Sequence, residues 1–262
     1  MSIKSILVCL QPAQNTSAVL DVAVDLARRH KAYLAGLHVA SPSDYEPSVA
    51  GFMSHAAVLE REFRERAEEV QLSHEWNCIE GNEESVIALE SRCHDILIIG
   101  QADPIARGLW TRPHDLLENI LIKSGHALMA VPYCASCPTV GDRILVAWNG
   151  AREAARATED AMPILKAARS VIVLTVDIRR GDALSVDHFV NYLERHDVRV
   201  EARGARSQGQ AIGDTILSKA ADFHCDLLVM GGYGHARARE HLLGGPTYSV
   251  VEHMTIPVLM SH

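Results

Sequence analysis

The chain has 262 residues, of which 48% are hydrophobic and 5% aromatic, and its formal net charge is −8. This length suffices for one large domain or two of ordinary size. An acidic chain without a basic cluster is not expected to bind nucleic acid. No apolar run approaches the roughly 20 residues that span a bilayer, and the amino-terminal segment lacks the features of a signal peptide. We therefore expect a cytoplasmic protein that does not engage a membrane.

Three segments of the first half recur, in the same order, in the second half. The matched pairs are 5–10 with 143–148, 94–100 with 225–231, and 127–129 with 258–260. Similar segments in the same order at a nearly constant offset indicate a duplicated domain. The stretch between the halves is rich in small residues and contains Pro138 and Gly141, as a linker does. We therefore predict two domains, 1–133 and 142–262.

Each half is expected to alternate strands and helices. The first half opens with a strand over 5–10, has a long charged helix at 56–71 and repeats the buried strand at 94–100. The second half has clearer periodicity, with Pro163 expected to kink or break its first helix. Its expected strands are 144–148, 171–176, 198–202, 227–230 and 257–260, and its expected helices are 153–169, 186–195, 211–223 and a last one from 246 to 253.

This alternation predicts an α/β fold: two tandem doubly wound domains, each a five-stranded parallel sheet with helices on both faces. In such sheets ligands bind at the carboxyl ends of the strands, where the winding reverses. In the second half those ends include Ala147 and Asn149, Val176, and the glycine-rich stretch 231–234. A nucleotide base can lie against the first two turns, with Asn149 bonding a ribose hydroxyl or a base edge.

Glycines follow the fourth strand of the second half in the pattern Gly-x2-Gly-x9-Gly, at Gly231, Gly234 and Gly244. Glycine lets a ligand lie directly against the backbone, and a turn leading into a helix offers N–H groups to an anion. We expect the N–H groups of 231–234 and 244–247, with the Thr247 hydroxyl, to bind phosphate. Arg237 can neutralise phosphate charge; the alternative is that it lies on a solvated loop or helix face.

The chain resembles the universal stress protein family at these residues. Family members carry Gly-x2-Gly-x9-Gly followed by Ser or Thr, and they open with a strand of the type Ile-Leu-Val-Ala-x-Asp-Gly, which 144–150 matches. The resemblance covers the whole chain, more strongly in 142–262 than in 1–133, and implies two such domains in tandem. It further implies ATP, usually accompanied by Mg²⁺, close to Ala147, Asn149, Val176, Gly231, Gly234, Gly244, Gly245, Pro246 and Thr247.

Two positions depart from the family pattern. Asn149 replaces the usual Asp, and Gly245 stands where Ser or Thr usually follows the third glycine. The first half departs further, because it lacks the glycine spacing and has Gln11 and Pro12 in place of Asp-Gly. We expect a degenerate first domain and a single nucleotide site in the second.

The expected function is ATP binding in a stress-response or signalling protein, with an intrachain pseudo-dimer and a homodimer as the expected association. No catalytic base, nucleophile or metal ligand is apparent beside the glycines, so at most slow ATP hydrolysis is expected. Two alternatives stay open: a protein-interaction adaptor without nucleotide, and a nucleotide-dependent transferase or hydrolase. Cys134 and Cys137 form a Cys-x2-Cys pair in the linker, either two free thiols or part of a redox or zinc site.

Overall fold

The computed structural model describes residues 2–12, 15–40, 49–102, 113–134, 139–177, 184–234 and 245–262. The chain divides into two compact units, 2–138 and 139–262. Among the described residues, no helix is both long and apolar enough to cross a membrane. Each unit is an α/β domain, described separately below.

The first unit has five parallel strands in the order β3-β2-β1-β4-β5. Asn15 and Asn82 accept backbone N–H groups at the starts of its first and third helices, the usual role of Asn before a helix. The elements are β1 Ser5–Cys9, α1 Thr16–His30, β2 Tyr33–Ala40, α2 Val49–Glu69, β3 His74–Glu80, α3 Glu83–Glu90, the short 3₁₀ helix Ser91–Cys93, β4 Ile96–Gly100, α4 Pro113–Ser124 and β5 Ala127–Val131.

The second unit repeats this topology with the strand order β8-β7-β6-β9-β10, again parallel throughout. Its elements are β6 Arg143–Ala147, α5 Arg152–Ala167, β7 Ser170–Val176, α6 Leu184–Arg195, β8 Val200–Ala205, α7 Ile212–Asp222, β9 Leu227–Gly231, α9 Pro246–His253 and β10 Val258–Ser261. The predicted fold class is thereby confirmed. The expected break at Pro163 is wrong: α5 continues through it, since burial of its apolar face against the sheet outweighs one missing hydrogen bond.

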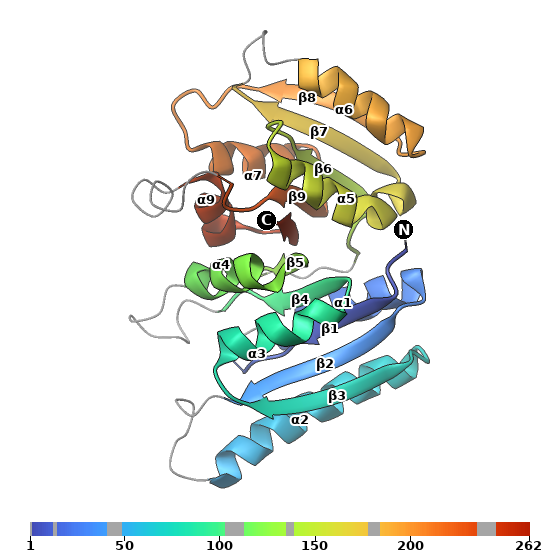
Figure 1. Ribbon diagram of the computed structural model, residues 1–262, viewed down its shortest axis with the longest axis vertical. Coiled ribbons are helices and arrows are strands. Elements are labelled where there is room, and N and C mark those ends of the chain that lie inside the picture. Colours follow the sequence, from blue (N-terminus) through green and yellow to red (C-terminus); the bar gives the residue numbers. More distant parts are fainter. Residues whose placement is uncertain are drawn as a thin grey trace. The chain divides into compact units, whose positions relative to one another are not determined.

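Helices cover both faces of each sheet (Figure 1). In the second unit α5 and α6 lie on one face and α7 and α9 on the other. Strands β6, β7, β9 and β10 are largely buried and consist mainly of Val, Ile, Leu and Met, as expected when both faces are covered. The edge strand β8 is mostly exposed. Because the sheet winds in opposite directions from β6, a switch point lies between β6 and β9.

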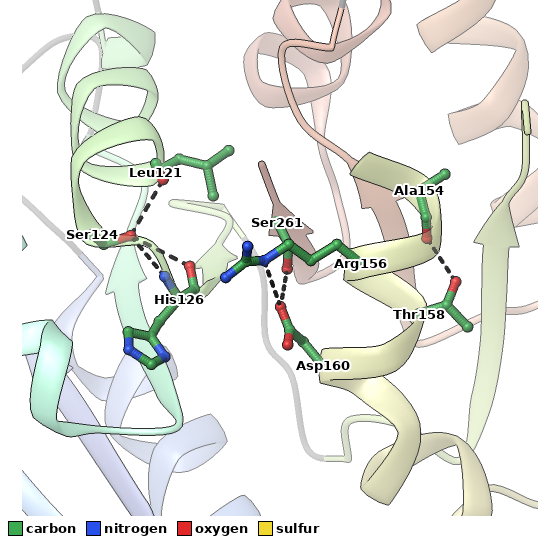
Figure 2. Close-up of polar contacts among 8 residues, drawn as sticks. All are labelled: Leu121, Ser124, His126, Ala154, Arg156, Thr158, Asp160 and Ser261. Atoms are coloured by element: carbon green, nitrogen blue, oxygen red, sulfur yellow. Dashed lines mark hydrogen bonds and ion pairs between the residues drawn. The ribbon is translucent and has the colours of Figure 1, made fainter. Parts of the chain in front are cut away.

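Helix α5 is joined to the end of β10 by polar contacts (Figure 2). The buried Ser261 hydroxyl donates to Asp160 at 2.7 Å, and Arg156 lies 3.9 Å from the same carboxylate. Within α5 itself, the Thr158 hydroxyl donates to the Ala154 carbonyl at 2.8 Å. The bond between Asp160 and Ser261 joins the middle of α5 to the end of β10.

A carboxylate before the fourth strand holds the start of the first strand in both units. Asp226 accepts the backbone N–H groups of 141, 142 and 143 at 2.9–3.1 Å. Asp95, at the matching position, accepts those of Lys4 and Ser5 at 2.6 and 3.0 Å. The recurrence of this arrangement in both halves shows that these residues serve the fold.

We expect Asp226→Ala to lower the free energy of unfolding of the second unit by about 2 kcal/mol, because three backbone donors lose a charged acceptor. Urea denaturation followed by circular dichroism measures the change. Asp222→Ala is the matched control, since Asp222 makes only an exposed ion pair with Lys219 and such pairs contribute little. Equal effects of the two substitutions would contradict the structural role of Asp226.

Candidate functional site

A pocket of about 410 Å³ lies at the switch point of the second unit. Its walls come from the carboxyl ends of β6, β7 and β9 and from the first turns of α5, α7 and α9. Every expected site residue that the structure describes lines it: Ala147, Asn149, Val176, Gly231, Gly234, Gly245, Pro246 and Thr247. Arg237 and Gly244, the other two, lie outside the described residues.

Most of the pocket wall is apolar. Leu174, Ile212, Ile216 and Met230 contribute to it, none of which the motif analysis singled out. Ile212 is 40% exposed although it is a large hydrophobic residue. Its exposure and its position at the start of α7 could have suggested a binding surface. An apolar pocket of this size with a few polar groups at one end suits a small organic ligand.

Trp148 forms a further part of the wall. Its backbone N–H donates to the Leu174 carbonyl at 2.9 Å, continuing the β6–β7 ladder by one residue. Its ring stacks on Phe189 of α6, with centroids 3.6 Å apart and planes within 4°. This stacking fixes an indole beside Ala147 and Asn149, at the end of the pocket where a base was expected.

The Asn149 side chain has a structural role. Its Oδ1 accepts the backbone N–H of Ala151 at 3.0 Å, just before α5 begins. The amide oxygen is therefore engaged with the protein, and its NH₂ group is what Asn149 can offer a ligand. An aspartate could form the same turn, so the change to Asn removes a charge without removing the local support for the helix.

Close approach explains the first two glycines of the motif. A Cβ built on Gly231 would lie 2.6 Å from the Ala154 backbone nitrogen and 2.7 Å from the Glu153 carbonyl carbon. One built on Gly234 would lie 2.6 Å from Oε2 of Glu153. Real Cβ atoms essentially never lie within 3.0 Å of another heavy atom, and at Gly231 the neighbour is backbone that cannot move aside easily. At Gly234 the neighbour is the end of a flexible side chain, so the requirement for glycine is weaker there. The first turn of α5 therefore packs directly on the glycine turn.

Two of the N–H groups expected to bind phosphate are used by the protein itself. The Gly232 N–H donates to the Ser261 carbonyl at 2.9 Å, extending the β9–β10 ladder. The Tyr233 N–H donates to Oγ1 of Thr247 at 3.2 Å. Thr247 is 3% exposed, and its hydroxyl oxygen joins the glycine turn to α9. The expectation that all N–H groups of 231–234 bind phosphate is therefore wrong for these two.

Glu153 is the charged residue of the pocket that sequence reasoning missed. Its side chain is 5% exposed. Its Oε1 accepts a hydrogen bond from the Nε–H group of the exposed Arg152, with the two atoms 2.5 Å apart. Burial raises the pKa of Glu153, but hydrogen bonds from Arg152 and from its own backbone N–H outweigh burial and leave the pKa below its usual value. Glu153 is therefore a carboxylate at neutral pH.

A second polar cluster joins α7 to α9 below the pocket. Ser249 donates a short hydrogen bond to Oδ1 of Asp214, and Nδ1 of His253 lies 3.1 Å from the same oxygen. The hydrogen bond from Ser249, with a smaller one from His253, lowers the pKa of Asp214. Both partners bond to the carboxylate, so His253 is not placed to take the serine proton. The cluster is thus unlike a catalytic triad.

The described residues contain no group of three or more His, Cys, Asp or Glu side chains that could bind a metal ion. Cys134 is an exposed free thiol, and its expected partner Cys137 lies outside the described ranges. Cys225 is buried before β9, and burial raises its pKa to about 11, which makes it a poor nucleophile at neutral pH.

At the matching strand ends of the first unit, two buried glutamine side chains bond to the backbone. Nε2 of the buried Gln11 donates to the Val39 carbonyl at 3.3 Å. In the strand registers Gln11 and Val39 correspond to Asn149 and Val176 of the second unit. Gln101, 2% exposed, stands where the second unit has Gly232, and its Oε1 accepts the Tyr133 N–H at 3.3 Å.

The site and fold define a doubly wound α/β protein with a ligand pocket at the switch point of its second sheet. Residues 141–262 match the universal stress protein family. The second half of the chain is therefore a universal stress protein domain.

Solved structures extend the likeness to the whole fold. A universal stress protein from Archaeoglobus fulgidus is 17% identical, with a TM-score of 0.78 over 98% of this chain and 96% of that chain. A candidate universal stress protein from Pseudomonas aeruginosa is 16% identical, with a TM-score of 0.64 over 98% and 92%. The chain thus has the fold of two universal stress domains in tandem.

A family member from Arabidopsis thaliana, solved with AMP bound, is similar over half of the chain. It is 17% identical and has a TM-score of 0.36 over 49% of this chain and 91% of that chain. No curated protein matches the sequence.

We expect Gly231→Ala to lower the unfolding free energy of the second unit by about 1–3 kcal/mol, because the new methyl group overlaps the backbone of α5. Gly204→Ala is the control: the nearest atom to its added Cβ lies 3.9 Å away. Chemical denaturation compares the two variants. A Gly231→Ala protein as stable as the control would show that α5 moves away without cost.

Proposed function

We propose that the second domain binds one adenine nucleotide, with ATP as the expected ligand, as a stress-response or signalling module. The observation that supports this most directly is the convergence of Ala147, Asn149, Val176 and the glycine turn on one pocket. These residues follow three different strands, β6, β7 and β9, and lie far apart in the sequence.

The pocket has the polarity that such a ligand requires. Its apolar walls beside Trp148 and Val176 suit a flat base. Its opposite end holds the glycine turn and the first turn of α9, which begins at Pro246 after Gly245. The N–H groups of Thr247 and the following residue lie in that first helical turn, where anions are favoured. Backbone donors that the structure does not describe, near Gly244, and the Arg237 side chain remain part of the proposal.

Mg²⁺, when it accompanies ATP, supplies positive charge to the phosphates. The residues present do not form a complete cation site, but a nucleotide-bound Mg²⁺ needs only one or two protein carboxylates besides phosphate oxygens. Glu153 is such a carboxylate in the pocket wall. The protein is proposed to bind the nucleotide without a dedicated catalytic group, so rapid turnover is not part of the function.

The first domain is proposed to be degenerate with respect to nucleotide. The Gln11 side-chain amide donates a hydrogen bond to the backbone carbonyl of Val39. Val39 corresponds to Val176 of the second domain, whose backbone is proposed to meet the base. A ligand there would have to displace a buried side chain and replace its hydrogen bond. We therefore propose one nucleotide per chain, in a cytoplasmic protein whose halves form a pseudo-dimer and whose chains pair as a homodimer.

Isothermal titration calorimetry of the full chain with Mg²⁺ and ATP tests the proposal, and the expected stoichiometry is one. Ala147→Leu should weaken binding at least about tenfold, because the larger side chain fills the pocket floor. Ala155→Leu, on the exposed side of α5, is the matched control and should bind as the parent does.

Other results would exclude parts of the proposal. Two nucleotides per chain would exclude the degenerate first domain. The absence of binding of ATP, AMP and adenosine would exclude the nucleotide function and favour an interaction adaptor. Binding that Ala147→Leu leaves unchanged would exclude this pocket as the site.

A further inference from the structure

Glu153 lies where it must influence any anionic ligand of the glycine turn. The Oε2 atom that a Cβ on Gly234 would meet at 2.6 Å is the carboxylate oxygen not bonded to Arg152. Gly234 is the second glycine of the motif, and both residues line the pocket together with Gly245 and Thr247. A buried carboxylate therefore borders the place at which phosphates are proposed to lie.

The charge of Glu153 is only partly compensated by its neighbour. Arg152 bonds to Oε1, but the Arg152 side chain is 84% exposed, so water screens its charge. Glu153 is 5% exposed, and its interaction with a nearby phosphate would be screened far less. A phosphate chain at the turn therefore meets repulsion that Arg152 does not remove.

The position of Glu153 on α5 prevents the side chain from moving away easily. The backbone of Glu153 and Ala154 contacts Gly231, and α5 is bonded to β10 through Asp160 and Ser261. The backbone that carries Glu153 is thus a fixed part of the wall, and the carboxylate itself is bonded to Arg152. A divalent cation between the two anionic groups would relieve this repulsion, and Mg²⁺ commonly joins one protein carboxylate to phosphate oxygens.

We propose that Glu153 makes phosphate binding at the glycine turn conditional on a divalent cation, so that this domain accepts a metal-bound nucleotide and rejects the metal-free one. This inference rests on the proposed nucleotide function and specifies the state of the nucleotide that the site takes. Adenosine, which carries no phosphate, should bind independently of the cation.

The experiment measures affinities of the full chain for ATP and adenosine by calorimetry, in excess Mg²⁺ and in EDTA. The parent should bind ATP at least about tenfold more weakly in EDTA, as expected for like charges at close range, and adenosine equally in both. Glu153→Gln keeps the shape and removes the charge. In EDTA it should bind ATP at least tenfold more tightly than the parent does, with little remaining effect of Mg²⁺.

Two further variants separate this role from a structural one. Arg152→Gln removes the positive charge that partly compensates Glu153. It should increase the ratio of the ATP dissociation constant in EDTA to that in Mg²⁺, whereas Glu153→Gln should decrease this ratio. Glu159→Gln, on the exposed face of the same helix, should leave the ratio unchanged. Thermal unfolding of each variant shows whether it is folded.

The outcomes are distinct. Equal ATP affinity of the parent in Mg²⁺ and EDTA, or a Glu153→Gln variant that keeps the parent's ratio, would overturn the cation dependence while leaving nucleotide binding intact. If Glu153→Gln does not fold, an unchanged ratio in Arg152→Gln overturns the inference. The absence of adenosine and ATP binding in the parent would overturn the proposed function, and the inference with it.

Discussion

The contact between the first turn of α5 and the glycine turn after β9 is the constraint on which the second domain depends. Gly231 lies so close to the α5 backbone that a single methyl group would overlap it. This contact sets the depth of the pocket, places Glu153 in its wall and leaves room for Asn149 to support the helix start. The glycine there serves helix packing as well as any ligand. The glycines proposed to border phosphate are therefore also packing residues.

The sequence was sufficient to predict the fold because the signals were strong and redundant. Buried strands such as β4 and β9 are short runs of Val, Ile, Leu and Met, and their recurrence gave the duplication. The last helix was expected to begin at Pro246, and α9 does begin there, where proline is favoured in the first helical turn. Pro163 misled because local propensity for a break was weaker than the burial of α5.

The site was less predictable than the fold. Side chains at strand ends could be placed together because parallel strands share an edge, which is why Ala147, Asn149 and Val176 were expected on one pocket. The partners of individual groups could not be predicted. Nothing in the order of residues indicates that Thr247 receives the Tyr233 N–H. Glu153 was missed because an acidic residue in the first turn of a helix is common for dipole reasons alone.

The side-chain amide of Gln11 donates to the backbone carbonyl of Val39 in the first domain. Its counterpart in the second domain, Val176, lines the pocket. A covalently attached group of this kind acts as a permanently bound ligand at saturating concentration. A free ligand adds stability in proportion to the logarithm of its concentration over its dissociation constant. Under the proposed function, the stability of the second domain would vary with the nucleotide concentration, whereas that of the first domain would not. If the proposal holds, duplication and divergence at the strand ends would place a constant scaffold and a ligand-responsive domain in one chain.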